Sequence, residues 1–162
     1  MSRVQEVAPE VDAGPLLSGA QFADAFRIDV AGRALDARQA AQRMMGRAPR
    51  WVQALLTLRN LLVAPFGLKT SGSTEHPPRE TIGLFPILTQ TPDRLVAGFN
   101  DKHLDFRVVV SRVHEDGVDK VVLSTVVSPH NFLGKAYLFL ISPFHKFGVR
   151  SIMSNAVAAG RV

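Results

Sequence analysis

The chain has 162 residues, of which 46% are hydrophobic and 20% are charged, and this composition is typical of a globular domain. It contains no cysteine, which excludes a disulfide-stapled fold, a thiolate zinc site and a cysteine nucleophile. The net charge of +5 is concentrated between Arg27 and Arg59, where seven arginines stand against two aspartates.

The N-terminal part predicts a tail followed by one strand. Residues 1–18 mix Pro, Gly, Glu and Val without a period, so we expect a flexible N-terminal tail and a single domain over residues 19–162. The segment 20–30 alternates as a strand does, with Phe22, Phe26 and Ile28 as its apolar members.

Two short helices are predicted after this strand. Asp36 can cap a helix that ends near Met45 and has small apolar residues on one face. Pro49 suits the first turn of a second helix, and Pro65 and Gly67 end it.

After a loop at 67–80, the apolar period changes to two, which indicates strands. We expect antiparallel strands over residues 82–90, 94–101, 103–114 and 120–128. Pro129 ends the last of them, and Asn131 caps a closing helix over residues 131–159. Pro143 lies inside this helix and predicts a kink, because proline cannot donate the helical hydrogen bond.

This order of elements predicts an α+β fold in which a curved antiparallel sheet packs on the long, kinked C-terminal helix. A curved sheet touches a straight helix only along a line, so we expect a cavity between the two. The predicted walls are aromatic and aliphatic: Tyr137, Leu140 and Phe144 from the helix, and Phe85, Phe99 and Phe106 from the strands.

The stretch "HLDFRVVV" places His103, Asp105 and Arg107 on one face of a strand. If this row faces the cavity, Arg107 could bind an anionic group, and His103 and Asp105 are candidate acid–base groups. If it faces outward, the row is a charged surface over an apolar core. Alternation along the strand favours the outward arrangement without deciding between the two.

Other site types find little support in the sequence. His103 and Asp105 could supply two metal ligands, but no third ligand is evident, so we expect no metal and no cofactor. The stretch "GLKTSGST" has two glycines at the spacing of a phosphate-binding loop, but Ser73 stands where such a loop requires lysine. No aromatic residues interleave with the arginines, so nucleic-acid binding is not expected. The arginine-rich helices could instead be a solvated face or a contact with anionic lipid.

Four stretches resemble a bacterial family catalogued as domain of unknown function 2867. They are "LRNLLVAPFGLK" (58–69), "IGLFPIL" (82–88), "DKHLDFRVVV" (101–110) and "VVSPHNFLGKAYLFLISPFHKF" (126–147). The order of elements is also similar to the helix-grip fold of the START-like superfamily, which includes lipid-transfer domains, plant allergens and polyketide cyclases. The resemblance implies a fold more than an activity.

Three functions therefore stay open. The leading hypothesis is a protein that binds a small apolar or amphipathic molecule between the sheet and the C-terminal helix. The second is a cyclase- or hydratase-type enzyme in the same cavity, and the third is a peripheral docking module. No signal peptide or membrane-spanning run is recognised, so a cytoplasmic location is expected. The sequence indicates neither the ligand nor an oligomeric state.

Overall fold

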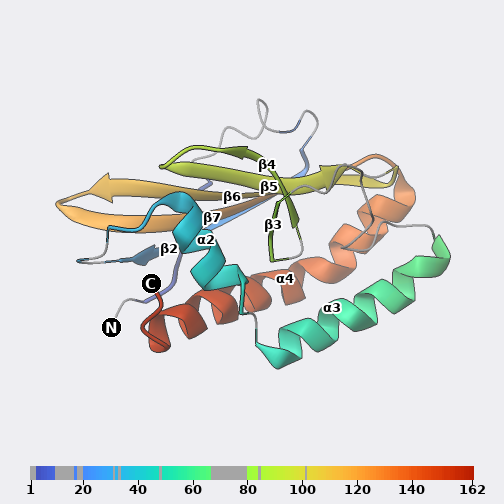
Figure 1. Cartoon of the computed structure of the whole chain (residues 1–162). Helices are drawn as coiled ribbons and strands as arrows, with labels where there is room; N and C mark the ends of the chain where they lie inside the picture. Colours follow the sequence, from blue (N-terminus) through green and yellow to red (C-terminus); the bar gives the residue numbers. More distant parts are fainter. Residues whose placement is uncertain are drawn as a thin grey trace.

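An open antiparallel sheet of seven strands dominates the computed structural model, which describes residues 3–9, 17, 20–30, 32, 34–47, 49–66, 80–83, 85–100 and 102–162 (Figure 1). The strands are β1 (Gln5–Val7), β2 (Phe22–Asp29), β3 (Thr81–Ile82), β4 (Phe85–Gln90), β5 (Arg94–Asn100), β6 (Leu104–Glu115) and β7 (Val118–Pro129). Their order across the sheet is β1-β2-β7-β6-β5-β4-β3. The N-terminal strand β2 therefore lies beside the last strand, with Phe22 opposite Val127 and Asp29 opposite Lys120.

The strand β1 differs from the prediction. Residues 1–18 were expected to form a tail, yet Gln5–Val7 pairs with the outer edge of β2. Glu6 on this strand accepts hydrogen bonds from Lys146, at 2.6 Å, and from Arg150, at 2.8 Å, on the C-terminal helix. A strand of this length is too short to show a periodicity, and its partners are distant in the chain. Sequence patterns therefore could not predict it.

The two predicted helices are present, but they follow the second strand of the sheet rather than the first. They are α2 (Ala37–Met45) and α3 (Arg50–Val63), and a short 3₁₀ turn, η1 (Ala64–Phe66), follows α3. Asp36 caps α2 as predicted, since its carboxylate accepts a hydrogen bond from the Gln39 backbone at 2.7 Å. The predicted small-residue face of α2 is buried. The predicted loop at 67–80 lies outside the described residues apart from Glu80.

The closing helix α4 (Phe132–Ala158) is a single element that runs through Pro143. Asn131 caps it, because its side-chain oxygen accepts a hydrogen bond from the Gly134 backbone at 3.0 Å. The kink at Pro143 stays a prediction. None of the helices in the part of the chain that the structure describes is long and apolar enough to cross a bilayer.

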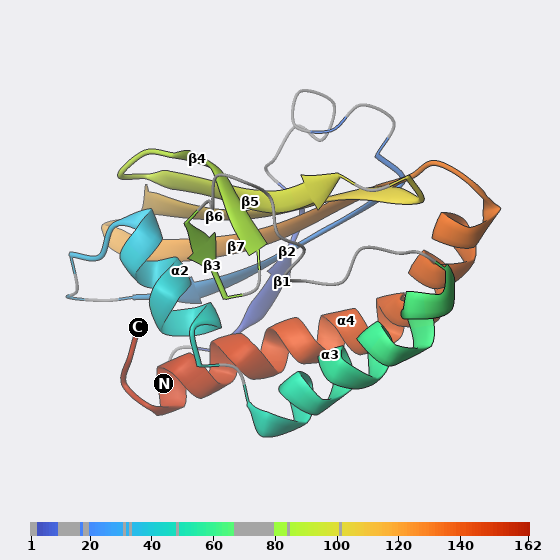
Figure 2. The same cartoon turned by 45° about the vertical axis from the view of Figure 1, so that its right-hand side comes forward.

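The helices α2 and α4 lie on the same face of the sheet, and α3 runs alongside α4 farther from the strands (Figures 1 and 2). The main core lies between α2, the C-terminal end of α4 and the sheet. Its fully buried large side chains include Phe26, Ile28, Met44, Leu95 and Met153. Trp51 on α3 meets Phe147 on α4 with ring centroids 5.2 Å apart. The N-terminal half of α4 thus lies beyond this core, where a cavity separates it from the strands.

Candidate functional site

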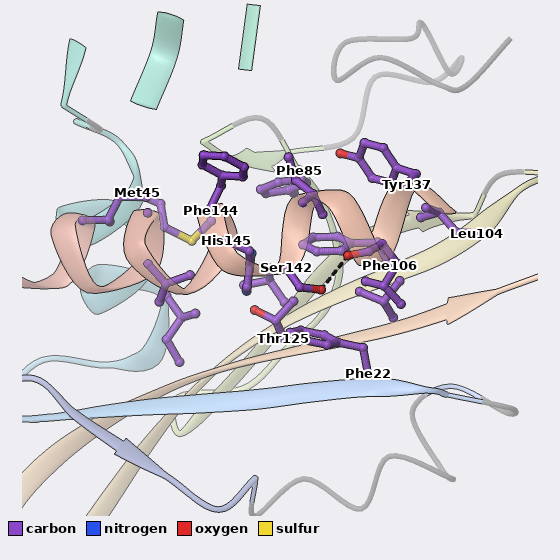
Figure 3. Close-up of a pocket in the computed structure, with 18 of the residues that line it drawn as sticks. Phe22, Met45, Phe85, Leu104, Phe106, Thr125, Tyr137, Ser142, Phe144 and His145 are labelled. Carbon is purple, nitrogen blue, oxygen red and sulfur yellow. Dashed lines mark hydrogen bonds between the residues drawn. The ribbon is translucent and has the colours of Figure 1, made fainter. Parts of the chain in front are cut away.

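A cavity of about 230 Å³ lies between α4 and the central strands of the sheet (Figure 3). Its walls come from β2, β4, β5, β6, β7 and α4, with Met45 of α2 and Trp51 of α3 closing one side. Most of the lining side chains are apolar. The volume suits a small ligand rather than a chain segment, and cavities of this kind are mostly apolar with a few placed polar groups.

The strand side of the cavity carries a cluster of three phenylalanines. Phe99 and Phe106 are cross-strand partners with ring centroids 5.6 Å apart. Phe85 lies 5.0 Å from the Phe106 ring and 6.4 Å from the Phe99 ring. Gly98 allows the backbones of β5 and β6 to approach closely beside this cluster, because its φ is 155° and a Cβ there would overlap the carbonyl oxygen of Phe106. The sequence-predicted strand residues therefore come together on one wall.

The helix side of the cavity agrees with the sequence prediction only in part. Tyr137 and Phe144 line the cavity, but Leu140 is 68% exposed and lies outside the lining. Ile141, Ser142 and other residues on an adjacent face of α4 turn toward the strands instead. The first half of α4 is apolar on several faces, with Phe132 and Phe139 each 86% exposed, so its hydrophobic pattern could not fix which face meets the sheet.

A polar cluster borders the cavity and consists of Thr125 and His145, which line it, and Asp24 beside them; it is called here the polar site. Asp24 on β2 and Thr125 on β7 are directly opposite each other in the sheet and face α4. His145 of α4 contacts Asp24, with its Nε2 3.4 Å from Oδ1 of the carboxylate. The other carboxylate oxygen, Oδ2, is 3.3 Å away, without hydrogen-bond geometry. Thr125 and His145 themselves line the cavity (Figure 3).

Two buried oxygens of the polar site are left without hydrogen bonds. Asp24 is 4% exposed and Thr125 is 1% exposed. Neither Oδ2 of Asp24 nor Oγ1 of Thr125 forms a hydrogen bond with any residue that the structure describes. Buried polar atoms nearly always have a partner, and an unsatisfied one costs roughly 1–3 kcal/mol. The polar site therefore has hydrogen-bonding capacity that the described residues do not use.

Sequence reasoning missed the polar site, although a signal for it is present. Asp24 stands between Phe22 and Phe26 in the alternating pattern of β2, at a position where the inward face requires an apolar residue. Thr125 interrupts the inward row of β7 between Leu123 and Val127 in the same way. A polar residue on an otherwise apolar strand face marks either a buried network or a site.

The sequence-predicted polar row lies outside the cavity. Leu104, Phe106 and Val108 line the cavity, so Asp105 and Arg107 alternate away from it. His103 lies just before β6 and is not part of the cavity lining. Arg107 donates hydrogen bonds to the carbonyl oxygens of Phe99, at 3.1 Å, and Phe106, at 2.9 Å, and to the Asn100 side chain at 2.6 Å. Burial lowers the pKa of Arg107, and the nearby charge of Asp105 opposes this shift. Arg107 thus holds the end of β5 in place.

The two histidines near this row hold the start of α4. His103 accepts a hydrogen bond from the Asn131 amide at 2.9 Å through Nδ1. Nε2 of His130 lies 3.1 Å from Oδ1 of Asp105. Asn131 is also the cap of α4, so these contacts connect the beginning of the helix to the beginning of β6. The row that was a candidate for catalysis therefore has a structural position outside the cavity.

The arginines of the first helices make contacts within the chain. Arg38 is 2.7 Å from Glu80, which raises the pKa of Arg38 and lowers the pKa of Glu80. Arg43 donates to the carbonyl oxygen of Arg161 at 3.0 Å. No group of three His, Asp or Glu side chains within the described ranges is placed to hold a metal ion.

Residues 16–152 match the family described as "Protein of unknown function (DUF2867)". No curated protein and no solved structure matches the chain.

Proposed function

Because the chain belongs to this family of unknown function, its activity has to be inferred from the site, and we propose that it binds a small apolar or amphipathic molecule in the cavity between α4 and the sheet. One observation carries the proposal: an apolar cavity of about 230 Å³ lies where the two layers separate, walled by aromatic side chains. A dry apolar cavity gains from an apolar occupant, because the lining atoms lack contacts on one side.

The arrangement of the layers supports a helix-grip architecture of START-like type as part of this proposal. A continuous antiparallel sheet packs on one long C-terminal helix, and the cavity lies between them. A cytoplasmic setting is part of this proposal, and the lack of cysteine is compatible with a reducing compartment.

The hypothesis of an enzyme with His103 and Asp105 as its acid–base groups has less support. Asp105 lies on the face of the sheet away from the cavity, and His103 is outside the cavity lining, so neither is placed beside a molecule held there. The docking alternative is also weaker, because Arg38 and Arg43 are engaged with Glu80 and the Arg161 carbonyl. Of the three hypotheses, ligand binding in the cavity therefore has the most support.

A thermal-shift screen of fatty acids, isoprenoids and polycyclic aromatics tests the proposal. A ligand that binds only the folded state raises the unfolding free energy by about 2.7 kcal/mol at a hundredfold excess over Kd. We expect at least one compound to raise the melting temperature. Ile141→Trp places an indole ring in the cavity and should abolish the shift.

Leu140→Trp is the matched control, since it adds the same group to the next residue, whose side chain is 68% exposed. The shift should survive in this variant. A ligand whose effect persists in Ile141→Trp, or disappears equally in both variants, would contradict binding in the cavity.

A further inference from the structure

We propose that the polar site formed by Asp24, Thr125 and His145 recognises a hydroxyl group, so that the ligand is an apolar molecule bearing an alcohol or a phenol. This inference rests on the proposed function and specifies it. Its starting point is the unused hydrogen-bonding capacity of two buried oxygens, Oδ2 of Asp24 and Oγ1 of Thr125.

Both oxygens are shielded from bulk water. Asp24 lies next to Thr125, outside the cavity lining. Thr125 lines the cavity on the sheet side, and Phe22 and His145 line it as well (Figure 3). Thr125 is only 1% exposed, and Asp24 directly across the strand pair is 4% exposed. Phe22 packs edge-on against the His145 ring, with centroids 5.8 Å apart, and screens the pair further. A polar group on a bound ligand is therefore a suitable partner for these atoms.

The chemistry of the three side chains selects the ligand group. The Thr125 hydroxyl can donate one hydrogen bond and accept others, and a carboxylate oxygen of Asp24 can only accept. A ligand hydroxyl has one proton to donate and lone pairs to accept with, so it can satisfy both atoms at once. His145 is held against Asp24 by the contact at 3.4 Å and serves as a positioning residue for the carboxylate.

Charged ligand groups fit less well. A ligand carboxylate would be placed beside the Asp24 carboxylate in an apolar cavity, where like charges repel strongly. A ligand ammonium group has three protons and needs acceptors for all of them, whereas Asp24 and Thr125 offer two unused oxygens. Burial of an incompletely paired charge is costly, while a neutral hydroxyl avoids this cost.

Calorimetric titration with four matched probes tests the proposal: naphthalene, 2-naphthol, 2-naphthoate and 2-(aminomethyl)naphthalene. The wild-type chain should bind 2-naphthol about 3- to 10-fold more tightly than naphthalene, the gain typical of one or two satisfied hydrogen bonds. It should bind both charged probes more weakly than 2-naphthol. Equal affinity for 2-naphthol and naphthalene, or tightest binding of a charged probe, would overturn the inference.

Thr125→Val removes the hydroxyl and keeps the shape of the side chain. It should abolish the advantage of 2-naphthol over naphthalene. Ser124→Ala is the control, because Ser124 is a buried hydroxyl on the same strand that points to the other face of the sheet. This control should retain the advantage. An equal loss for both probes in Thr125→Val would mean that Thr125 acts through shape alone, against the proposal.

Asp24→Asn provides an independent arm that does not depend on Thr125. It removes the negative charge, so the discrimination against 2-naphthoate should narrow. Unchanged discrimination in this variant would contradict a role for the Asp24 carboxylate. If the wild-type chain binds none of the four probes, the proposed function itself fails, and this outcome is distinct from binding without preference for the hydroxyl.

Discussion

The two aspartate–histidine pairs of this protein use the same chemistry in different surroundings. Asp24 and His145 connect the sheet to the middle of α4, with side-chain exposures of 3% and 21%. Asp105 and His130 connect β6 to the residue before the α4 cap, with exposures of 18% and 41%. The shorter contact, at 3.1 Å, belongs to the more exposed pair, and the buried pair is the looser one at 3.3–3.4 Å.

This difference indicates that the Asp105–His130 pair has a structural role, whereas the Asp24–His145 pair belongs to the proposed binding site. The exposed pair lies beside a network that includes Asn131, and hydration supplies whatever hydrogen bonds the protein does not. The buried pair has no such access to water, and Oδ2 of Asp24 stays unsatisfied by the described residues. Incomplete satisfaction in a buried position is expected where a ligand completes the network.

The largest expected effect is the loss of stability when His145 is replaced. His145→Ala removes the partner of a buried carboxylate and should lower the free energy of unfolding by about 2 kcal/mol. His130→Ala removes the partner of a more exposed carboxylate and should lower it by less than about 1 kcal/mol. Urea denaturation of both variants, with unchanged m-values, measures the two losses. Equal losses would mean that burial does not distinguish the pairs.

Arg107 lies in the polar row that faces away from the cavity, and its substitution should have an intermediate effect on stability. Arg107→Met keeps the apolar stem but removes the hydrogen bonds to the Phe99 and Phe106 carbonyl oxygens and to Asn100. We expect the free energy of unfolding to fall by about 1–2 kcal/mol. Because Arg107 lies on the face away from the cavity, the affinity for cavity ligands should not change.

Calorimetric titration with the same probe on Arg107→Met and on wild type checks the second half of this prediction. A large loss of affinity in folded Arg107→Met would show that Arg107 contributes to the binding site.

The smallest effect concerns Glu6, an exposed contact of β1 with α4. Hydrogen bonding to Lys146, assisted by the charges of Lys146 and Arg150, lowers the pKa of Glu6 below the ordinary value for a glutamate. A carboxyl group with a lowered folded-state pKa stabilises the protein above its unfolded pKa, and this contribution is lost as the pH falls through the folded value. Glu6→Gln should therefore lower the melting temperature slightly near neutral pH.

The difference between Glu6→Gln and wild type should shrink below about pH 4 and in high salt, since exposed ion pairs are screened. Melting curves across this pH range measure it. A difference that stays constant down to about pH 3 would mean that Glu6 acts through something other than its charge.

The α+β class, most of the strands and the closing helix could be predicted from local sequence patterns. Alternation with a period of two fixed β5, β6 and β7, and Asp36 and Asn131 marked the starts of α2 and α4. The family also followed from the sequence, through the stretches around His103, His130 and Pro143. The phenylalanines of the cavity wall could be predicted because each alternates inward on its strand.

The face of α4 that meets the sheet, and the polar residues that gather at the cavity, depend on tertiary packing. An apolar helix surface on several sides gives no unique inner stripe, so Leu140 was predicted to face inward and Ile141 was not. Asp24, Thr125 and His145 are up to 121 positions apart in the chain. Local patterns carry no information about such a distance, because strand pairing and helix packing, rather than propensity, bring these side chains together.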